Sequence, residues 1–327
     1  MKLTISVAMC TFNGGRFLPE QLESIAAQKR LPDELVVCDD RSSDRSAEVV
    51  KDFAGRMPFP VRLTVNESTL GSTRNFEKAI ALCRSDIVAL ADQDDIWYPD
   101  KLAHLEQVFL SSPMVVAAFS DADVIDHDSQ PLNLRLWHSF GFDPREQRRF
   151  AAGHGVKVLI KHPVVTGAVL GFRRQWTDVL LPIPDNDVHD RWMSFLLAAS
   201  GPFALVTQPL MQYRRHINQQ IGLGTTTLRE RLMRARSTKA SLYQDEIRRF
   251  RRLYDRLAEH NGHLPNAHLA ITEIERKISH LEHRIQLHQQ TFSRVPKVMR
   301  EIFNRGYWRY AAGWESVAKD LFLYGNR

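Results

Sequence analysis

The chain has 327 residues, of which 43% are hydrophobic and 25% charged, a composition that excludes an intrinsically disordered protein. No apolar stretch approaches the ~20 residues that a helix needs to span a bilayer, and the three cysteines form no disulfide pattern. The net charge of +6 is unevenly placed, because residues 228–327 hold 20 Lys and Arg against 11 Asp and Glu.

The first third of the chain alternates between strand-like and helix-like segments. Apolar, β-branched runs predict strands at residues 3–9, 34–38, 61–65, 86–91 and 115–119. Helical spacing of apolar residues predicts helices at about residues 18–25, 47–53 and 72–82, and another that opens at Pro99. Strands and helices that alternate in this way predict a mostly parallel sheet covered on both faces.

From about residue 227 the pattern changes to long amphipathic helices. Apolar residues alternate between spacings of four and three from Tyr243 to Leu257 and again from Ile271 to Ile285, with a polar break at residues 260–265. This spacing predicts two helices folded back as an antiparallel hairpin. We therefore expect an α/β domain at residues 1–226 and a basic helical hairpin or extension at residues 227–327.

Polar clusters follow three of the predicted strands, at residues 11–13, 39–40 and 92–95. In sheets of this kind ligands bind beyond the carboxyl ends of the strands, so the three clusters converge on one edge. Three carboxylates within residues 92–95 repel one another unless a cation compensates them, and Mg²⁺ or Mn²⁺ bound with donor phosphates is the obvious cation. The alternative is a solvated acidic turn that caps the next helix.

The same stretches carry a resemblance to a known family. Residues 6–13 (SVAMCTFN), 37–44 (VCDDRSSD) and 91–97 (ADQDDIW) resemble family 2 glycosyltransferases of the GT-A fold, over roughly residues 1–220. Residues 189–192 (HDRW) and 213–216 (YRRH) are similar to bacterial rhamnosyltransferase-like enzymes of surface polysaccharide synthesis. The resemblance implies an α/β, Rossmann-like mixed sheet flanked by helices, with a C-terminal helical region.

The activity that the resemblance implies is an inverting, metal-dependent transfer of a sugar, by resemblance rhamnose, from a nucleotide diphosphate donor to an acceptor hydroxyl. The product would be a cell-surface polysaccharide such as O-antigen or capsule, and the cofactor Mn²⁺ or Mg²⁺. Processive members carry a Gln-x-x-Arg-Trp motif and membrane helices; this sequence has neither, which predicts the addition of one or a few sugars.

By the same resemblance, the donor side is formed by residues from the strand ends. Asp40 would accept a hydrogen bond from the base, while Asp39 contacts the ribose or holds its loop. Asp94 would be the main metal ligand, and His216 would complete the metal shell or close over the diphosphate. The remaining residues assigned to the nucleotide sugar are Thr11, Phe12, Asn13, Arg74, Asp92 and Gln93. A surface role for Arg74 is the alternative.

On the acceptor side, Asp190 is the expected general base, because it precedes an apolar helical pattern and so lies in a first helical turn. Asp185 and Asp187 are nearby alternatives. By the family resemblance, Thr166 and Gly167 form the loop that admits the acceptor. Trp192 either stacks on a sugar ring or belongs to the core.

Two rival functions share these features. A nucleotidyltransferase requires a Gly-rich basic loop after the first strand, where this chain has residues 10–15 (CTFNGG). A non-catalytic nucleotide-sugar-binding scaffold would not need the carboxylates. No nucleic-acid partner is expected, because the basic region lacks interleaved aromatic residues of a known module.

The expected partners are the donor and a saccharide or lipid-linked saccharide acceptor. The basic C-terminal helices predict contact with an anionic membrane or self-association as a homo-oligomer, or else a solvated surface. Residues 1–15 are interpreted as a buried strand and turn, not a signal sequence. The expected location is the cytoplasm, at the inner face of the cell membrane.

Overall fold

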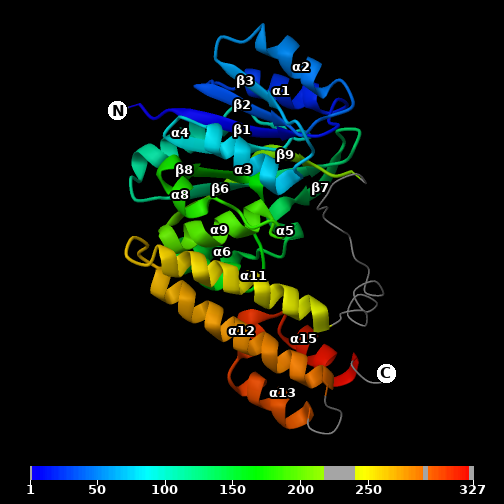
Figure 1. Cartoon of the computed structure of the whole chain (residues 1–327), viewed down its shortest axis with the longest axis vertical. Coiled ribbons are helices and arrows are strands. Elements are labelled where there is room, and N and C mark those ends of the chain that lie inside the picture. Colours follow the sequence, from blue (N-terminus) through cyan, green and yellow to red (C-terminus); the bar gives the residue numbers. More distant parts are fainter. Residues whose placement is uncertain (1, 217–239, 290–293, 324–327) are drawn as a thin grey trace.

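The computed structural model describes residues 2–216, 240–289 and 294–323, and its centre is a single nine-stranded sheet (Figure 1). The strand order is β3-β2-β1-β4-β8-β6-β9-β5, with β7 paired to β6. The strands are β1 (Ile5–Thr11), β2 (Glu34–Asp39), β3 (Val61–Val65), β4 (Ile87–Ala91), β5 (Ile96–Trp97), β6 (Ala117–Ile125), β7 (Pro131–Arg135), β8 (Leu170–Arg173) and β9 (Phe203–Arg214).

Helices flank this sheet. Those of the α/β part are α1 (Leu18–Ala26), α2 (Ser46–Ala54), α3 (Ser72–Leu82), α4 (Lys101–Ser111), α5 (Leu136–Ser139), α6 (Pro144–Arg149), α7 (Gly155–Leu159), α8 (Thr177–Leu180) and α9 (His189–Ser200). The C-terminal ones are α11 (Ala240–Glu259), α12 (Ala267–Gln289), α13 (Arg294–Phe303), α14 (Gly306–Tyr310) and α15 (Trp314–Ala318).

The sheet is mixed, as the family resemblance implies. Strands β1 to β4 pair in parallel, and β6 pairs in parallel with β9. The expectation of a mostly parallel sheet is incomplete, because β8 is inserted between β4 and β6 and runs antiparallel to both. Every residue of β1 and β4 is buried, since both faces of these central strands are covered.

Predicted element bounds hold best where the local pattern is strong. The strand at residues 61–65 and the helix at residues 72–82 are confirmed. The helix expected to open at Pro99 begins at Lys101 instead, because Pro99 and Asp100 form a turn that the Lys101 N–H closes onto the Tyr98 carbonyl at 3.1 Å.

The C-terminal helices extend the same core. Helices α11 and α12 lie side by side at one end of the molecule (Figure 1), and Phe250 of α11 meets Phe195 of α9 with ring centroids 6.4 Å apart. The apolar residues of α11 thus join the hydrophobic cluster that contains the sheet. The expected domain boundary at residue 227 lies outside the described residues. Among the helices in the described ranges, none is long and apolar enough to cross a membrane.

Candidate active site

The acidic residues after β4 meet the end of β9. Strand β5 pairs with β9, so the chain that leaves β9 at Arg214 returns to the acidic cluster. There the Nε2 atom of His216 lies 2.7 Å from the Oδ2 atom of Asp94, and the His216 ring packs against Phe17 with centroids 5.0 Å apart. Asp94 and His216, expected as metal ligands, are thus neighbours although 122 residues separate them.

The carboxylates of this cluster raise one another's pKa values. Burial, followed by the charges of Asp94 and Asp190, raises the pKa of Asp92 to about 7. Burial, followed by the charges of Asp94 and Asp92, raises the pKa of Asp95 well above its usual range, and only one of its two oxygens has a hydrogen-bond partner. Burial and mutual repulsion therefore disfavour the ionised forms of these carboxylates in the protein alone.

This arrangement fits a divalent cation that is bound only in part by the protein. Within the described ranges, no three or more His, Cys, Asp or Glu side chains are grouped to hold a metal by themselves. Asp94 and His216 offer one carboxylate oxygen and one imidazole nitrogen, with Asp92 close by. Mg²⁺ and Mn²⁺ commonly take the rest of their ligands from substrate phosphates and water.

The loops after β1 and β2 are held together by their own acidic residues. Asp39 accepts hydrogen bonds from the Thr11 hydroxyl at 2.7 Å and from the Ser42 hydroxyl at 2.6 Å, and these contacts hold its loop against β1. The side chain of Thr11 is buried by this contact, whereas the neighbouring Phe12 ring is half exposed. Phe12 is therefore the residue of this pair that faces solvent.

Asp40 is also engaged within the protein. Its carboxylate accepts from Asn66 Nδ2 at 2.9 Å and from the backbone N–H groups of Leu70 and Gly71 at 2.7 and 2.8 Å. A carboxylate has about four acceptor positions, and these bonds occupy three of those of the buried Asp40. The bonds fix the loop that leads into α3, where Arg74 lies.

The side chain of Gln93 joins the loop after β4 to the loop after β1. Its Oε1 atom accepts from the Phe12 N–H at 2.9 Å, and its Nε2 atom donates to the Phe12 carbonyl at 3.1 Å. Asn13 ties the same loop to β2, because its Oδ1 atom accepts from the Ser43 N–H at 2.8 Å. Gln93 and Asn13 therefore link the three strand-end loops, while the side chains of Thr11, Asp39 and Asp40 are buried.

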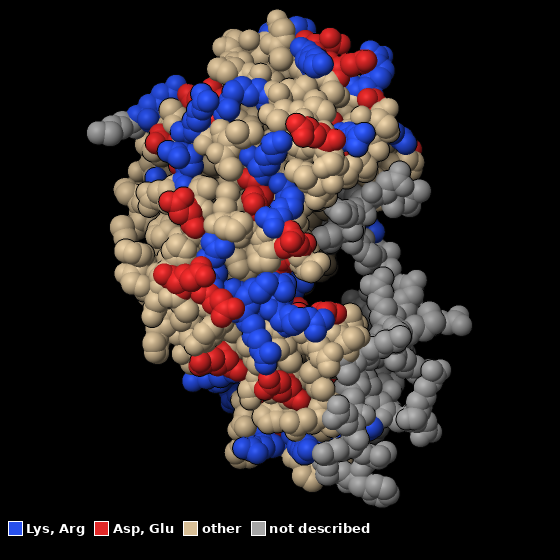
Figure 2. Space-filling model, in the orientation of Figure 1, with Lys and Arg blue, Asp and Glu red and all other residues tan. Residues whose placement is uncertain are grey.

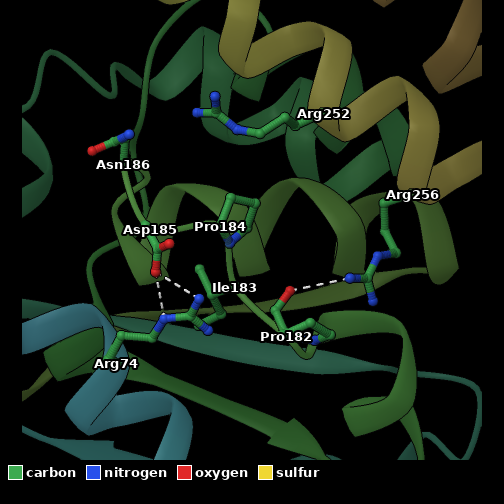
Figure 3. A pocket seen from close by; sticks show the side chains of 8 residues that line it. All are labelled: Arg74, Pro182, Ile183, Pro184, Asp185, Asn186, Arg252 and Arg256. Carbon is green, nitrogen blue, oxygen red and sulfur yellow. Dashed lines mark hydrogen bonds and ion pairs between the residues drawn. The ribbon is translucent and has the colours of Figure 1, made fainter. Parts of the chain in front are cut away.

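Arg74 points toward the segment that precedes α9 (Figure 3). Its guanidinium donates to Asp185 Oδ1 at 2.7 Å and to Glu77 at 2.8 Å, beside a pocket of about 360 Å³ that Arg252 and Arg256 of α11 also line. A donor bound by Arg74 would have to compete with these two carboxylates.

The expected general base lies at the start of α9. Asp190 Oδ2 accepts from the Gly167 N–H at 3.3 Å, a long contact that leaves most of the carboxylate available. Its neighbour His189 is buried and stacked on Phe76 with centroids 4.2 Å apart. A Cβ on Gly167 would approach His189 Nε2 to 2.6 Å, so this loop position requires glycine. Thr166, next to it, is partly exposed.

The other acceptor-side residues have internal partners. Trp192 is buried and its Nε1 atom donates to the Leu180 carbonyl at 2.8 Å, which is the core position and not the sugar-stacking one. Asp185 is paired with Arg74, and Asp187 is buried with Arg252 3.8 Å away. Of the three acidic candidates, Asp190 is the least engaged.

Comparison with known proteins decides the family. The profile of glycosyl transferase family 2 matches residues 6–181, which is more than half of the chain. The chain belongs to glycosyl transferase family 2.

Relatives of this family 2 chain include two with stated sugars. It is 26% identical over 221 residues to the dTDP-rhamnosyl transferase RfbG of Shigella flexneri, a match that covers 65% of this chain and 73% of RfbG. It is 30% identical over 112 residues to the abequosyltransferase RfbV of Salmonella typhimurium, covering 34% and 33% of the two chains. An uncharacterized glycosyltransferase of Nostoc is 29% identical over 131 residues, which is 40% of each chain.

Solved structures share the fold. TarS of S. aureus in complex with UDP-GlcNAc aligns with a TM-score of 0.58 at 15% identity, over 86% of this chain and 72% of that one. The mannosyltransferase PcManGT of Pyrobaculum calidifontis, in complex with GDP-Man and Mn²⁺, gives 0.50 at 17% identity, over 99% and 85%. The implied GT-A fold is confirmed by these neighbours.

Two site residues of the family 2 chain were not anticipated from its sequence. Lys101 is buried; its Nζ atom donates to the Ala168 carbonyl at 2.7 Å, and burial lowers its pKa to about 7 although Asp95 and Asp92 oppose this. A signal existed, because Lys101 precedes the inward-facing Leu105 by four residues and so shares its helix face.

Arg214 is the second such residue and is fully buried. Its Nε atom donates to the Asp94 carbonyl at 2.7 Å, and its backbone N–H donates to Asp95 Oδ1 at 3.0 Å. Its guanidinium also forms an ion pair with Glu20 of α1. Arg214 therefore fixes the acidic loop from behind, a role that no local pattern of the sequence indicates.

Proposed function

We propose that the chain is an inverting glycosyltransferase that moves a sugar from a nucleoside diphosphate donor to an acceptor hydroxyl of a surface polysaccharide. A deoxythymidine diphosphate rhamnose donor is the specific hypothesis, supported by the similarity to RfbG. The observation that carries the proposal is the layout of the acidic groups. Asp94 contacts His216, and Asp92 lies close enough for the charge of Asp94 to affect its pKa. Asp190 contacts the N–H of Gly167 on the neighbouring loop.

In this proposal the protein binds the donor through the strand-end loops. The half-exposed Phe12 ring packs against the base, and the remaining acceptor position of Asp40 takes a base N–H. Asp94 and His216 hold Mn²⁺ or Mg²⁺, which when bound neutralises charge on the diphosphate. The acceptor enters beside the partly exposed Thr166, next to Gly167, whose N–H contacts Asp190.

Asp190 acts as the general base of the transfer. Its carboxylate accepts the proton of the acceptor hydroxyl while that oxygen forms a bond to the anomeric carbon. The bond from that carbon to the diphosphate breaks on the opposite face, and the electron pair leaves with the diphosphate. Asp190 lies in the first turn of α9, at the end of the helix that faces the Gly167 loop.

A pair of variants tests the two ends of this site separately. Asp190→Asn should lower kcat by about 10²–10⁴-fold, since general-base catalysis contributes that much. The same variant should keep the rise in melting temperature that deoxythymidine diphosphate with Mn²⁺ gives the wild type. Asp94→Asn should lose the Mn²⁺-dependent part of that rise, because a ligand stabilises only through the state it binds.

The matched control is Asp178→Asn, which removes an exposed carboxylate of α8. It should change neither kcat nor the thermal shift. Wild-type turnover in Asp190→Asn would show that Asp190 is not the general base. Unchanged metal dependence and turnover in Asp94→Asn would show that Asp94 does not bind the cation.

A further inference from the structure

The C-terminal helices present apolar side chains to solvent. On α13, Val295, Met299 and Phe303 recur every four residues and therefore share one face, and they are 61%, 56% and 90% exposed. Trp308 and Trp314 are 37% and 67% exposed, and their rings meet edge to face at 5.2 Å. The apolar stripe denotes these five exposed residues, three on one face of α13 and a tryptophan pair on the α14 and α15 segment that follows it. Apolar side chains that are grouped in this way usually mark an interaction surface.

The stripe belongs to a helix that is anchored by its opposite face. Val298 is fully buried in a small cluster with Leu287, Tyr307 and Val317. Glu301 is buried as well, with Oε2 2.5 Å from His280 Nδ1 of α12. The exposed face of α13 is therefore not a core face left open by a loosely packed helix.

Basic residues accompany the stripe. Residues 294–318 contain five Lys and Arg but only two acidic residues, one of which is the buried Glu301. Arg300, Arg305 and Arg309 are exposed. The surface around the stripe is thus positively charged as well as apolar.

The helical hairpin, in contrast, uses its buried cations internally. Arg284 is paired with Asp320 at 2.8 Å, Lys277 donates to the Tyr310 carbonyl at 2.6 Å, and Arg256 donates to the Leu181 carbonyl at 2.7 Å. On the face shown in Figure 2, basic and acidic side chains are interspersed over the hairpin. Residues 240–289 hold eight Lys and Arg against seven Asp and Glu, so within the described ranges the basic excess lies on α13 to α15 more than on the hairpin.

We propose that the apolar stripe and its basic neighbours dock onto an anionic lipid surface, with α13 lying in the plane of the interface. A helix with one apolar face and basic flanks gains both apolar burial and attraction to anionic headgroups in that position. Tryptophan rings such as those of Trp308 and Trp314 favour the headgroup level. The stripe lies at the end of the molecule away from α2 and β3 (Figure 1), so docking leaves that part of the sheet uncovered.

Charge favours lipid over a second copy of the chain as the occupant. An isologous dimer through the stripe would bring Arg300, Arg305 and Arg309 of one protomer close to the same residues of the other. Like charges in such proximity weaken association, whereas an anionic bilayer complements them.

The test is flotation of the full chain with vesicles of phosphatidylcholine, either alone or with about one third phosphatidylglycerol. Binding to the anionic vesicles is expected, with little binding to the neutral ones and a decline at high salt. The double variant Met299→Ser/Phe303→Ser should bind at least about tenfold more weakly, because two apolar side chains no longer enter the bilayer. Arg305→Ser should weaken binding by about fivefold, the effect of one basic residue near the surface.

Matched controls remove the same residue types elsewhere. Met114→Ser deletes an exposed methionine after α4, and Arg251→Ser deletes an exposed arginine of the hairpin; both should bind as the wild type does. Binding should also shift tryptophan emission to the blue, and Trp308→Phe/Trp314→Phe should lose that shift. The proposal fails if no vesicles are bound, if Met299→Ser/Phe303→Ser binds normally, or if sedimentation shows a dimer that this variant dissociates.

Discussion

Lys101 connects the two ends of the candidate active site. Its ammonium group lies near the carboxylates of Asp92 and Asp95 and donates to the carbonyl of Ala168. The adjacent residue, Gly167, donates its N–H to Asp190. A single buried side chain thus positions the loop that contacts the general base while it partly balances the acidic cluster.

Removing this ammonium group should loosen the loop. In Lys101→Met the Ala168 carbonyl loses its partner inside the protein, which costs about 1–3 kcal/mol of unfolding free energy. We expect kcat to fall while the KM for the donor changes little, because the donor-side loops keep their own bonds. Urea unfolding and steady-state kinetics measure the two effects.

Lys29→Met is the matched control for this variant, since Lys29 is exposed and its pair with Asp100 lies at the surface. It should leave both quantities near the wild-type values. A Lys101→Met protein with normal kcat and lowered stability would make Lys101 a purely structural residue.

At the scale of single residues, the sequence indicates which side chains gather but not which way each one points. The order of strands predicts that residues 11–13, 39–40 and 92–95 share one edge, whereas the roles of His216 and Asp190 are implied by the family resemblance. The side chains of Thr11 and Trp192 point into the protein because they bond to Asp39 and to Leu180, which are distant in the chain. The pairing of Glu20 with Arg214 spans 194 residues and follows no local pattern.

At the scale of elements, a buried ion cluster ties α6 to the end of α7. Glu146 of α6 is buried and contacts Lys161 Nζ and His162 Nε2, each at 2.8 Å. Burial by itself raises the pKa of Glu146, but the hydrogen bonds and charges of His162 and Lys161 prevail and lower the pKa to about 2. Glu146 thus stays ionised in the folded protein at acidic pH values at which it is already protonated in the unfolded chain.

This difference predicts a pH-dependent contribution to stability. The pKa of Glu146 is lower in the folded protein than in the unfolded chain, so its contribution is complete above about pH 4.5 and declines as the pH falls toward 2. Glu146→Gln should cost roughly 1–2 kcal/mol at pH 7, discounted for the solvent around Lys161 and His162, and less at pH 3. Urea unfolding at the two pH values measures this.

Glu67→Gln, at an exposed position, should show no such difference between the two pH values. An equal cost of Glu146→Gln at pH 7 and pH 3 would rule out the ion cluster as its source. The contribution of Glu146 would then come from packing.

Elements with a strong local period were predicted with nearly correct bounds, and elements defined by pairing were not. Strand β3 and helix α3 follow directly from their spacing of apolar residues. Strand β8 has only four residues, including Gly171, and is a strand because it pairs with both β4 and β6. A Cβ on Gly171 would lie 3.1 Å from a Leu105 methyl group. The lack of a side chain at Gly171 therefore allows β8 to pack closely against α4.

At the scale of the whole molecule, the C-terminal helices share one hydrophobic core with the sheet. Phe250 is fully buried where α11 meets α9. Phe250→Ala should lower the unfolding free energy by about 3–5 kcal/mol, because a large buried ring leaves a cavity. If the core is continuous, far-UV circular dichroism and tryptophan emission should report the same single transition in urea.

Leu242→Ala, at an exposed position of α11, should cost little. Two separated transitions in the wild type or in Phe250→Ala would instead favour a C-terminal region that folds independently of residues 1–226.

The bridge that Gln93 makes to Phe12 has a thermodynamic consequence. Its amide is bonded to both the N–H and the carbonyl of Phe12, so the loop after β4 cannot shift without the loop after β1. A cation on one loop and a nucleotide base on the other would then select the same arrangement of both. Reciprocity requires each of these two ligands to strengthen the other's binding by an identical factor.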